Sequence, residues 1–199
     1  MHKQTYLIRH GETEWSLSGR HTGITDIPLT KNGQMQAKTV GKRLSDHPFE
    51  AIFTSPLQRA LHTCELSGLS KKAEVDPDLI EWNYGDFEGL TTEEIRKKQP
   101  DWTIFSDGAP HGESVADIST RAIRMLAKIH SFQGDVALFS HGHFLRVLAV
   151  MWLHLPAYDG KLFSLFPSSI SILGYEHSNA VLISWNDTAH LLSHPTNRS

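Results

Sequence analysis

Tyr6-Leu7-Ile8-Arg9-His10-Gly11-Glu12 is the stretch of this 199-residue chain that decides the fold. Its apolar residues stop at Arg9-His10-Gly11, which is typical of a short buried strand that ends in a turn. The same pattern recurs at residues 135–142 and, more weakly, at residues 51–56. Three short strands that end alike predict one sheet with polar residues along one edge.

Helical patterns separate these strands. Thr30 is a good N-cap for a helix that runs to about Ser45, with Met35, Val40 and Leu44 on its apolar side. A strand that is followed by a helix and then by another strand is typical of a parallel sheet.

Further helices are expected later in the chain. Ser55 is suited to cap a helix that has Pro56 in its first turn and ends near Gly68. Residues 91–94 form a capping-box sequence for a short helix, and residues 114–129 show helical spacing behind a capping serine.

The C-terminal part completes the expected architecture. An apolar helix runs to about Leu155, and residues 170–185 alternate like a hairpin, followed by a polar tail at about 190–199. We therefore expect a single α/β domain over residues 1–199, built as a three-layer α/β/α sandwich with a mostly parallel sheet.

The composition argues against several classes of protein. The net charge of −3 does not favour binding to nucleic acid or to an anionic membrane. A single cysteine, Cys64, leaves no internal disulfide framework. The longest apolar run, residues 147–153, is far shorter than the ~20 residues that span a bilayer. With no signal-peptide core behind Met1, we expect a cytoplasmic protein.

Positively charged and imidazole side chains collect at the expected strand ends. Arg9 and His10 follow the first strand, Arg59 lies one turn beyond the second, and His141 follows the third. The carboxyl ends of parallel strands share one edge of a sheet, where ligands commonly bind. Two guanidiniums and helix N-termini at that edge predict a pocket for an anion, with phosphate as the leading ligand.

The residues at these positions resemble the histidine phosphatase superfamily, in the branch of phosphoglycerate mutases and metal-independent phosphatases. The resemblance covers nearly the whole chain and implies a phosphoglycerate mutase-like fold. Arg-His-Gly alone is a weak signal, whereas the ordered set of motifs is a strong one. The matching stretches are residues 7–13, 22–23, 54–60, 79–81, 85–89, 112–114 and 140–142.

The resemblance implies a role for each residue at the site. His10 would attack phosphorus and form a phosphohistidine, while Arg9, Arg59 and His141 would bind the phosphoryl oxygens. Glu81 would protonate the leaving oxygen and then activate water. A histidine nucleophile must be neutral, which its ordinary pKa near ~6.5 allows. Its other ring nitrogen needs an acceptor, which the backbone near Gly11 can supply.

The same resemblance implies contacts with the substrate at Ser16, Thr22, Gly23, Gly142 and His143. No metal or other cofactor is expected, because two guanidiniums and an imidazolium would already neutralise the phosphate. The expected partner is a small phosphorylated metabolite.

The choice between mutase and phosphatase depends on a few positions. Phosphoglycerate mutases have an arginine directly after the acid, where this chain has Trp82, and an asparagine where it has Ser16. Residues 85–89, Gly-Asp-Phe-Glu-Gly, follow the phosphatase pattern. We therefore expect a phosphatase, with a phosphoglycerate mutase as the alternative.

Finer similarity points to the subgroup of sedoheptulose-1,7-bisphosphatase-like enzymes. It is carried by residues 14–23, 81–86, 102–108 and 141–146. A sugar bisphosphate would need a second cationic site at the rim, which we expect to include residues about 90–112. The candidate cations are Arg20, His21, Lys97 and Lys98.

The same residues also allow simpler interpretations than a phosphatase site. His10, His141 and His143 could be structural or could bind a metal, although two flanking arginines would repel a cation. The chain could also be a non-catalytic relative that binds phosphorylated ligands. Arg9 and Arg59 could pair with carboxylates, and Glu81 could be a solvated loop residue. The carboxylates concerned are Glu12, Asp26 and Glu65 for the arginines, and Asp86 and Glu88 as other candidates for the acid. Glu12 and Glu113 are expected to support the site.

Overall fold

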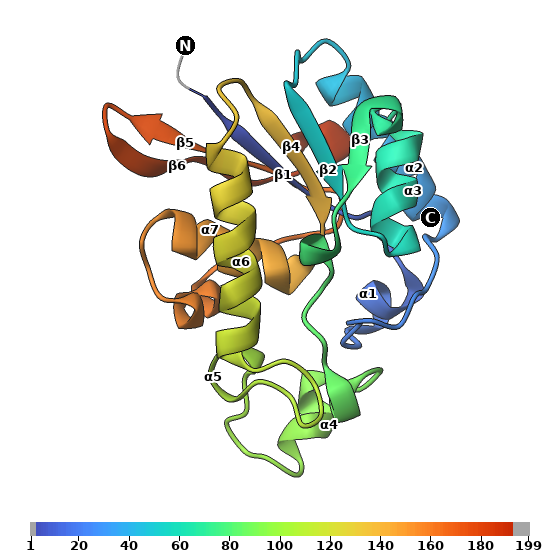
Figure 1. Ribbon diagram of the computed structural model, residues 1–199. Helices are drawn as coiled ribbons and strands as arrows, with labels where there is room; N and C mark the ends of the chain where they lie inside the picture. The colour runs from blue at the N-terminus through green and yellow to red at the C-terminus, as the bar shows by residue number, and fades with distance from the viewer. Residues whose placement is uncertain (1–2, 193–199) are drawn as a thin grey trace.

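The computed structural model describes residues 3–192, and its centre is one six-stranded sheet (Figure 1). The strand order is β3-β2-β4-β1-β5-β6. The first four of these strands are parallel, and β5 and β6 run antiparallel at one edge. The expected mostly parallel sheet is confirmed. The strands are β1 (Thr5–Arg9), β2 (Ala51–Thr54), β3 (Ala73–Val75), β4 (Val136–Ser140), β5 (Ile170–Glu176) and β6 (Asn179–Asp187).

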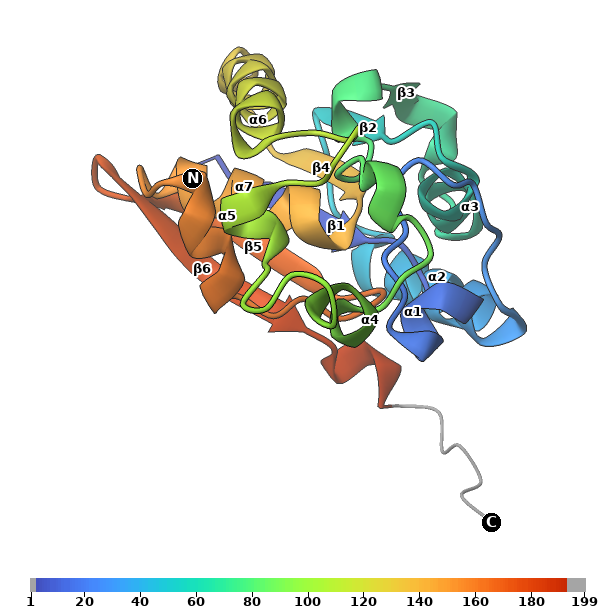
Figure 2. The same cartoon turned by 90° about the horizontal axis from the view of Figure 1, so that it is seen from below.

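Helices cover both faces of this sheet, which gives the expected three layers (Figure 2). α2 and α3 pack together on one face, and α6 and α7 pack together on the other. The helices are α1 (Glu14–Ser18), α2 (Lys31–Leu44), α3 (Gln58–Leu66), α4 (Thr92–Arg96), α5 (Ile104–Asp107), α6 (Val115–His130) and α7 (Gly142–Trp152). The short 3-10 turns are η1 (Ser70–Lys72), η2 (Pro77–Leu79), η3 (Gly85–Phe87), η4 (Ala157–Leu162) and η5 (Ala189–Leu191).

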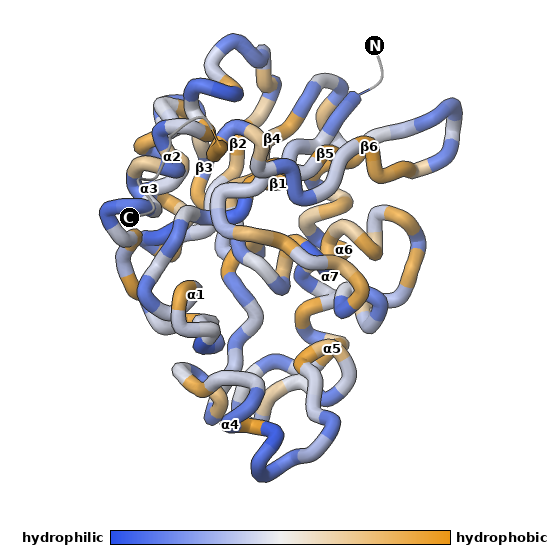
Figure 3. Tube along the Cα trace, turned by 180° about the vertical axis from the view of Figure 1, so that it is seen from behind, coloured by the Kyte–Doolittle hydropathy of each residue, from blue (hydrophilic) through white to orange (hydrophobic). Residues whose placement is uncertain are grey.

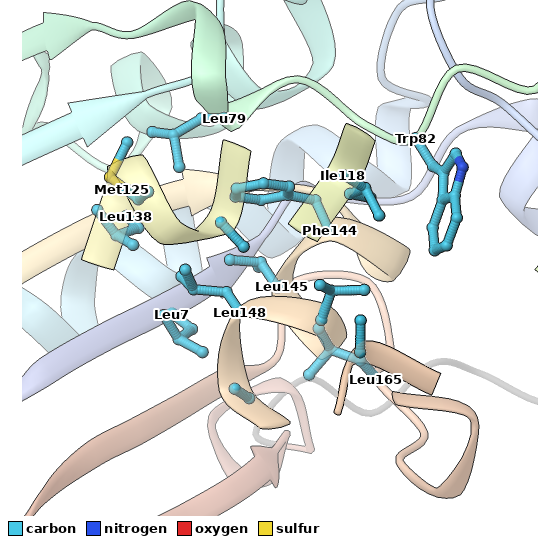
Figure 4. Close-up of a cluster of buried hydrophobic side chains, with 14 of the residues drawn as sticks. Leu7, Leu79, Trp82, Ile118, Met125, Leu138, Phe144, Leu145, Leu148 and Leu165 are labelled. Atoms are coloured by element: carbon cyan, nitrogen blue, oxygen red, sulfur yellow. The ribbon is translucent and has the colours of Figure 1, made fainter. Parts of the chain in front are cut away.

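Alternation along the strands supplies a separate core to each face. On β1, Leu7 faces the cluster under α6 and α7, whereas Tyr6 and Ile8 face the cluster under α2 and α3. Figure 4 shows the first cluster, in which Phe144 and Leu148 pack between the helices and the sheet. Both faces are therefore covered, as a parallel sheet requires.

Several helix starts follow the expected capping signals, and one does not. The side chains of Thr30, Thr91 and Ser114 each accept a backbone N–H at the start of α2, α4 and α6. The expected cap at Ser55 is wrong, because α3 begins at Gln58 and its N-cap, Leu57, makes no side-chain bond. Ser55 lies in the loop before the helix and serves the site described below.

Met35 and the C-terminal tail differ in how far the structure tests them. Met35 was expected on the apolar side of α2 but is 56% exposed, because Val40 and Leu44 make up the buried stripe. Most of the expected polar tail, residues 193–199, lies outside the described residues. No helix within residues 3–192 is long and apolar enough to cross a membrane.

Residues 85–112 extend beyond the carboxyl ends of the strands, at the foot of the molecule in Figure 1. They carry η3, α4 and α5, and the loop after α4 is strongly hydrophilic (Figure 3). This segment therefore stands at the edge of the sheet where the sequence places the chemistry.

Candidate active site

Three strand ends bring the expected side chains together. Arg9 pairs with Ser140 in the parallel register of β1 and β4, so His10 and His141, the next residues, lie side by side. Their ring centroids are 5.2 Å apart. Arg59 reaches His141 from the first turn of α3, with its Nε–H donating to His141 Nδ1 at 3.1 Å. His10, Arg59 and His141 are all buried.

His10 is oriented by its own backbone. Its Nδ1 lies 2.7 Å from the carbonyl oxygen of Gly11, which can only accept a hydrogen bond. The neutral ring therefore carries its proton on Nδ1, and Nε2 keeps its lone pair. Burial, together with the charges of Arg59 and Arg9, holds the pKa of His10 well below 6.5. The expected acceptor near Gly11 is present.

His141 is neutral, contrary to the expected imidazolium. The Arg59 Nε–H donor requires a lone pair on His141 Nδ1, so the ring proton lies on Nε2, 2.8 Å from Ser55 Oγ. Burial and the positive charge of Arg59 hold the pKa of His141 well below 6.5. Both nitrogens are engaged, so His141 offers no lone pair to a metal ion.

Arg59 is held by backbone carbonyls. Its remaining donors reach the carbonyl oxygens of Thr22, Gly23 and Thr25 at 2.7–3.2 Å. The loop of residues 22–25 is fixed in turn by Glu88, whose carboxylate accepts the backbone N–H groups of Gly23 and Ile24 and the Thr25 hydroxyl. The described residues show no ion pair of Arg59 with the carboxylates considered from sequence.

Arg9 directly precedes His10 at the end of β1. One of its terminal nitrogens donates to the Leu165 carbonyl, and its Nε is buried without a partner. The guanidinium rests on Gly142 at the start of α7, where a Cβ atom would lie 3.3 Å from Arg9 Cζ. Gly142 therefore makes room for Arg9, which leaves the substrate contact expected at this glycine without support in the geometry.

Glu81 is held as a carboxylate at the N-terminus of α7. Its Oε1 accepts the backbone N–H groups of Trp82 (2.9 Å) and Phe144 (2.8 Å), and its Oε2 accepts that of His143 (2.9 Å). Burial alone would raise the pKa of Glu81. Hydrogen bonds from His143, together with the electrostatic effect of His143 and His141, instead hold the pKa of Glu81 well below 4.5. Glu81 is 4% exposed, so it is not a solvated loop residue.

A small cavity lies against part of this cluster, and neither Arg59 nor His141 is among its lining residues. Its lining includes six of the expected site residues: Arg9, His10, Ser16, Thr22, Glu81 and His143. The other lining residues are Thr13, Arg20, His21 and Tyr84. The expected positions Ser16 and Thr22 thus line the cavity, whereas Gly23 lies behind Arg59, to which its carbonyl is bonded.

Comparison with known proteins agrees with this geometry. A model of the histidine phosphatase superfamily (branch 1) matches residues 5–188. The chain belongs to the histidine phosphatase superfamily.

Individual relatives refine this assignment. The chain is 43% identical over 188 residues to an acid phosphatase of Mycobacterium tuberculosis, covering 92% of each chain. It is 39% identical over 181 residues to sedoheptulose 1,7-bisphosphatase of Saccharomyces cerevisiae, covering 75% of this chain and 67% of that one. A solved structure from Mycobacterium tuberculosis matches with a TM-score of 0.89 at 40% identity, covering 92% of this chain and 97% of that one. The expected fold and the expected phosphatase class are confirmed.

A second, larger cavity of ≈ 400 Å³ opens beside the first in this histidine phosphatase. His21 and His143 line both cavities, so the two are neighbours. Three cations line the outer cavity, Arg96 from α4, Arg146 from α7 and Lys161 from η4, and no carboxylate does. The aromatic and polar remainder of the lining is Thr92, Trp102, Thr103, Ile104, Phe105 and Leu162.

The four residues considered for a second cationic site lie in different places. Lys97 and Lys98 line neither cavity, and Lys97 lies near Glu93 on exposed α4. Arg20 lines the inner cavity and donates to the Gly89 carbonyl and to Glu94. His21 lines both cavities.

Sequence reasoning missed Arg96, Arg146 and Lys161, because their common position depends on how three separate elements pack. It also missed Tyr84, whose hydroxyl lies 2.7 Å from His143 Nδ1. Burial raises the pKa of Tyr84 well above 10, so its phenol stays protonated and can donate or accept this bond.

Two carboxylates expected to support the site do so. Glu12 accepts from Thr30 and Asn32 at the start of α2, which anchors the loop after His10. Glu113 binds Arg121 in a buried ion pair and accepts the backbone N–H of Asn83, which fixes the segment that follows Glu81.

Proposed function

We propose that this histidine phosphatase hydrolyses phosphate monoesters through a phosphohistidine on His10, without a metal ion. The observation that carries the proposal is the bare Nε2 of a neutral, buried His10 that lies within the electrostatic influence of the Arg59 and Arg9 guanidiniums. A lone pair in a pocket that favours anions is what attack on phosphorus requires. A protein that only bound phosphorylated ligands would need no such orientation of the ring.

The reaction then proceeds in two steps. His10 Nε2 attacks phosphorus, the bond from phosphorus to the ester oxygen breaks, and Glu81 gives its proton to that oxygen. In the second step Glu81 takes a proton from water, the water oxygen bonds to phosphorus, and the bond from phosphorus to His10 breaks. Because Glu81 is ionised in the free protein, its proton enters with the substrate, whose bound phosphate raises the pKa of that carboxyl.

The substrate class follows from the outer cavity. We propose a small sugar phosphate that carries a second phosphate, bound by Arg96, Arg146 and Lys161 while the first meets His10. Residues 90–112 supply much of that wall and would form the substrate rim. The name of the yeast relative, a sugar bisphosphatase, supports this class.

A phosphoglycerate mutase is the second candidate, because three cations can also receive the carboxylate of 3-phosphoglycerate. Position 82 argues against it. Trp82 is fully buried and points into the core (Figure 4), so this loop has no arginine at the cavity after the acid. The cytoplasmic location stays a prediction.

The test is phosphate release in excess chelator from sugar monophosphates, sugar bisphosphates and 3-phosphoglycerate. We expect preference for a bisphosphate and no release by His10→Ala. Arg146→Met should raise KM for the bisphosphate at least about tenfold, because a charge-assisted contact is lost. The KM for an aryl phosphate, which has no second phosphate, should stay nearly unchanged. Lys97→Met, a cation outside both cavities, is the matched control. Isomerised phosphoglycerate without free phosphate would favour the mutase instead.

A further inference from the structure

Ser168 and Ser169, the two buried residues of the turn at 166–169, hold the backbone of Arg9 and of the nucleophile, His10. Ser168 donates its backbone N–H to the carbonyl oxygens of His10 (3.0 Å) and Arg9 (3.2 Å). Ser169 accepts the backbone N–H of Arg9 at 3.3 Å. The turn thus continues the pairing of β1 with β5 past the end of the sheet.

The bond to His10 fixes the peptide that orients the nucleophile. The carbonyl of the His10–Gly11 peptide accepts from Ser168, and its N–H donates to Thr63 Oγ1 at 3.0 Å. A peptide held at both polar atoms cannot rotate freely. The next carbonyl, that of Gly11, is the acceptor for His10 Nδ1. Ser168 therefore helps to set the direction of the Nε2 lone pair.

The turn itself needs support. Ser168 is buried and lies at φ +56°, a left-handed conformation that costs a non-glycine residue about 1–3 kcal/mol. Two side chains from the C-terminal end of β6 and from η5 bracket it. His190 Nε2 lies 2.9 Å from the Ser168 carbonyl, and Asn186 Oδ1 accepts the backbone N–H of Phe166 at 2.7 Å.

We propose that His190 and Asn186 are positioning residues for the nucleophile, acting through the Ser168 turn. They touch no substrate, and their effect reaches the reaction through the His10–Gly11 peptide. The inference rests on the proposed function, since it takes His10 as the nucleophile. It assigns a catalytic consequence to side chains at the far end of the sequence from His10.

The experiment compares His190→Ala and His190→Gln by the burst of nitrophenol from a nitrophenyl phosphate, which reports the attack by His10. His177→Gln, an exposed histidine in the hairpin between β5 and β6, is the matched control. We expect His190→Ala to slow the burst about tenfold, with KM within about twofold, because a small misplacement of a reacting atom is costly. His190→Gln should recover most of the rate, since its amide can still donate to Ser168.

Asn186→Gly is a second variant that tests the same proposal if His190→Ala fails to fold. Glycine keeps the left-handed backbone found at Asn186 and removes only the acceptor for Phe166, so the burst should again slow with KM preserved. Equal losses in the Ala and Gln variants, or an unchanged burst in folded His190→Ala and Asn186→Gly, would overturn the proposal. Activity retained by His10→Ala would instead overturn the proposed function, which separates the two failures.

Discussion

Glu81→Gln is the substitution that tests the proposed chemistry most directly. The carboxylate accepts three backbone N–H groups, two at Oε1 and one at Oε2. The amide oxygen of glutamine can keep the two bonds at Oε1, but its NH₂ group would then face the N–H of His143. The substitution therefore removes the ionisable group and one charge-assisted hydrogen bond, while the volume of the side chain stays the same.

The structure sets a magnitude for each effect. Loss of a positioned general acid and base should slow hydrolysis of an alkyl phosphate about 10²- to 10⁴-fold. Loss of one hydrogen bond to a charged group should lower the free energy of unfolding by about 1.5–3 kcal/mol at neutral pH. Because the folded protein holds the pKa of Glu81 well below 4.5, this contribution is present above the unfolded value and disappears as pH falls through the folded one.

The assay uses two esters that differ in their need for an acid. A nitrophenolate leaves without a proton, so Glu81→Gln should still release one equivalent of nitrophenol and then stall as the phosphohistidine. The sugar oxygen of a sugar phosphate must be protonated as it leaves in the first step. Glu81→Gln should therefore release no burst of sugar from this ester. Asp86→Asn is the matched control, an exposed carboxyl beside His111. Equal losses on both esters, with no trapped phosphohistidine, would refute the role given to Glu81.

Four further predictions follow from the site. Because the pKa of His10 is held well below 6.5 by burial and by Arg59, kcat/KM should not fall between pH 7 and well below pH 6.5; a fall that begins at or above pH 6.5 contradicts a buried neutral nucleophile. The unfolded chain binds that proton more readily, so the free energy of unfolding should fall as pH drops below about 6.5, measured by denaturant titration. Dialysis against a chelator should leave phosphate release unchanged, since two guanidiniums supply the charge that a metal would. Trp82→Phe should cost about 1–3 kcal/mol of stability in thermal melts through the lost bond from its indole N–H to the Glu113 carbonyl, with kcat/KM nearly unaffected, because Trp82 lines neither of the two cavities.

The parts of the fold that sequence predicts are those whose signal is local. Apolar runs of three to four residues that are followed by Arg9-His10 or by Ser140-His141 indicate buried strands, and Thr30 and Ser114 mark helix starts through their own side chains. Ser55 carries the same local signal, and its hydroxyl accepts the backbone N–H of Leu57 at 3.3 Å, but α3 begins only at Gln58. Ser55 Oγ also lies 2.8 Å from Nε2 of His141, a residue 86 positions away, and no local pattern contains that contact.

Two short elements, β3 and α1, were also not predicted. β3 has three residues, is half exposed and pairs only with β2, so its strand character comes from its neighbour. α1 is a single turn that a capping box at Thr13 closes. In the site, His10, Arg59 and Glu81 were predicted from motifs, whereas Arg146 and Lys161 meet only because α7 and η4 pack together.

The charges around His10 and His141 explain why these two histidines can stay neutral. Arg9 and Arg59 bring two positive charges near them and Glu81 one negative charge, so this cluster has a net positive charge in a protein of net charge −3. Carbonyl oxygens of Thr22, Gly23 and Thr25 solvate Arg59 without cancelling its charge. Protonating His10 would add a third cation to that site, whereas a phosphate would neutralise it. The arrangement that attracts the substrate therefore also keeps the nucleophile's lone pair free.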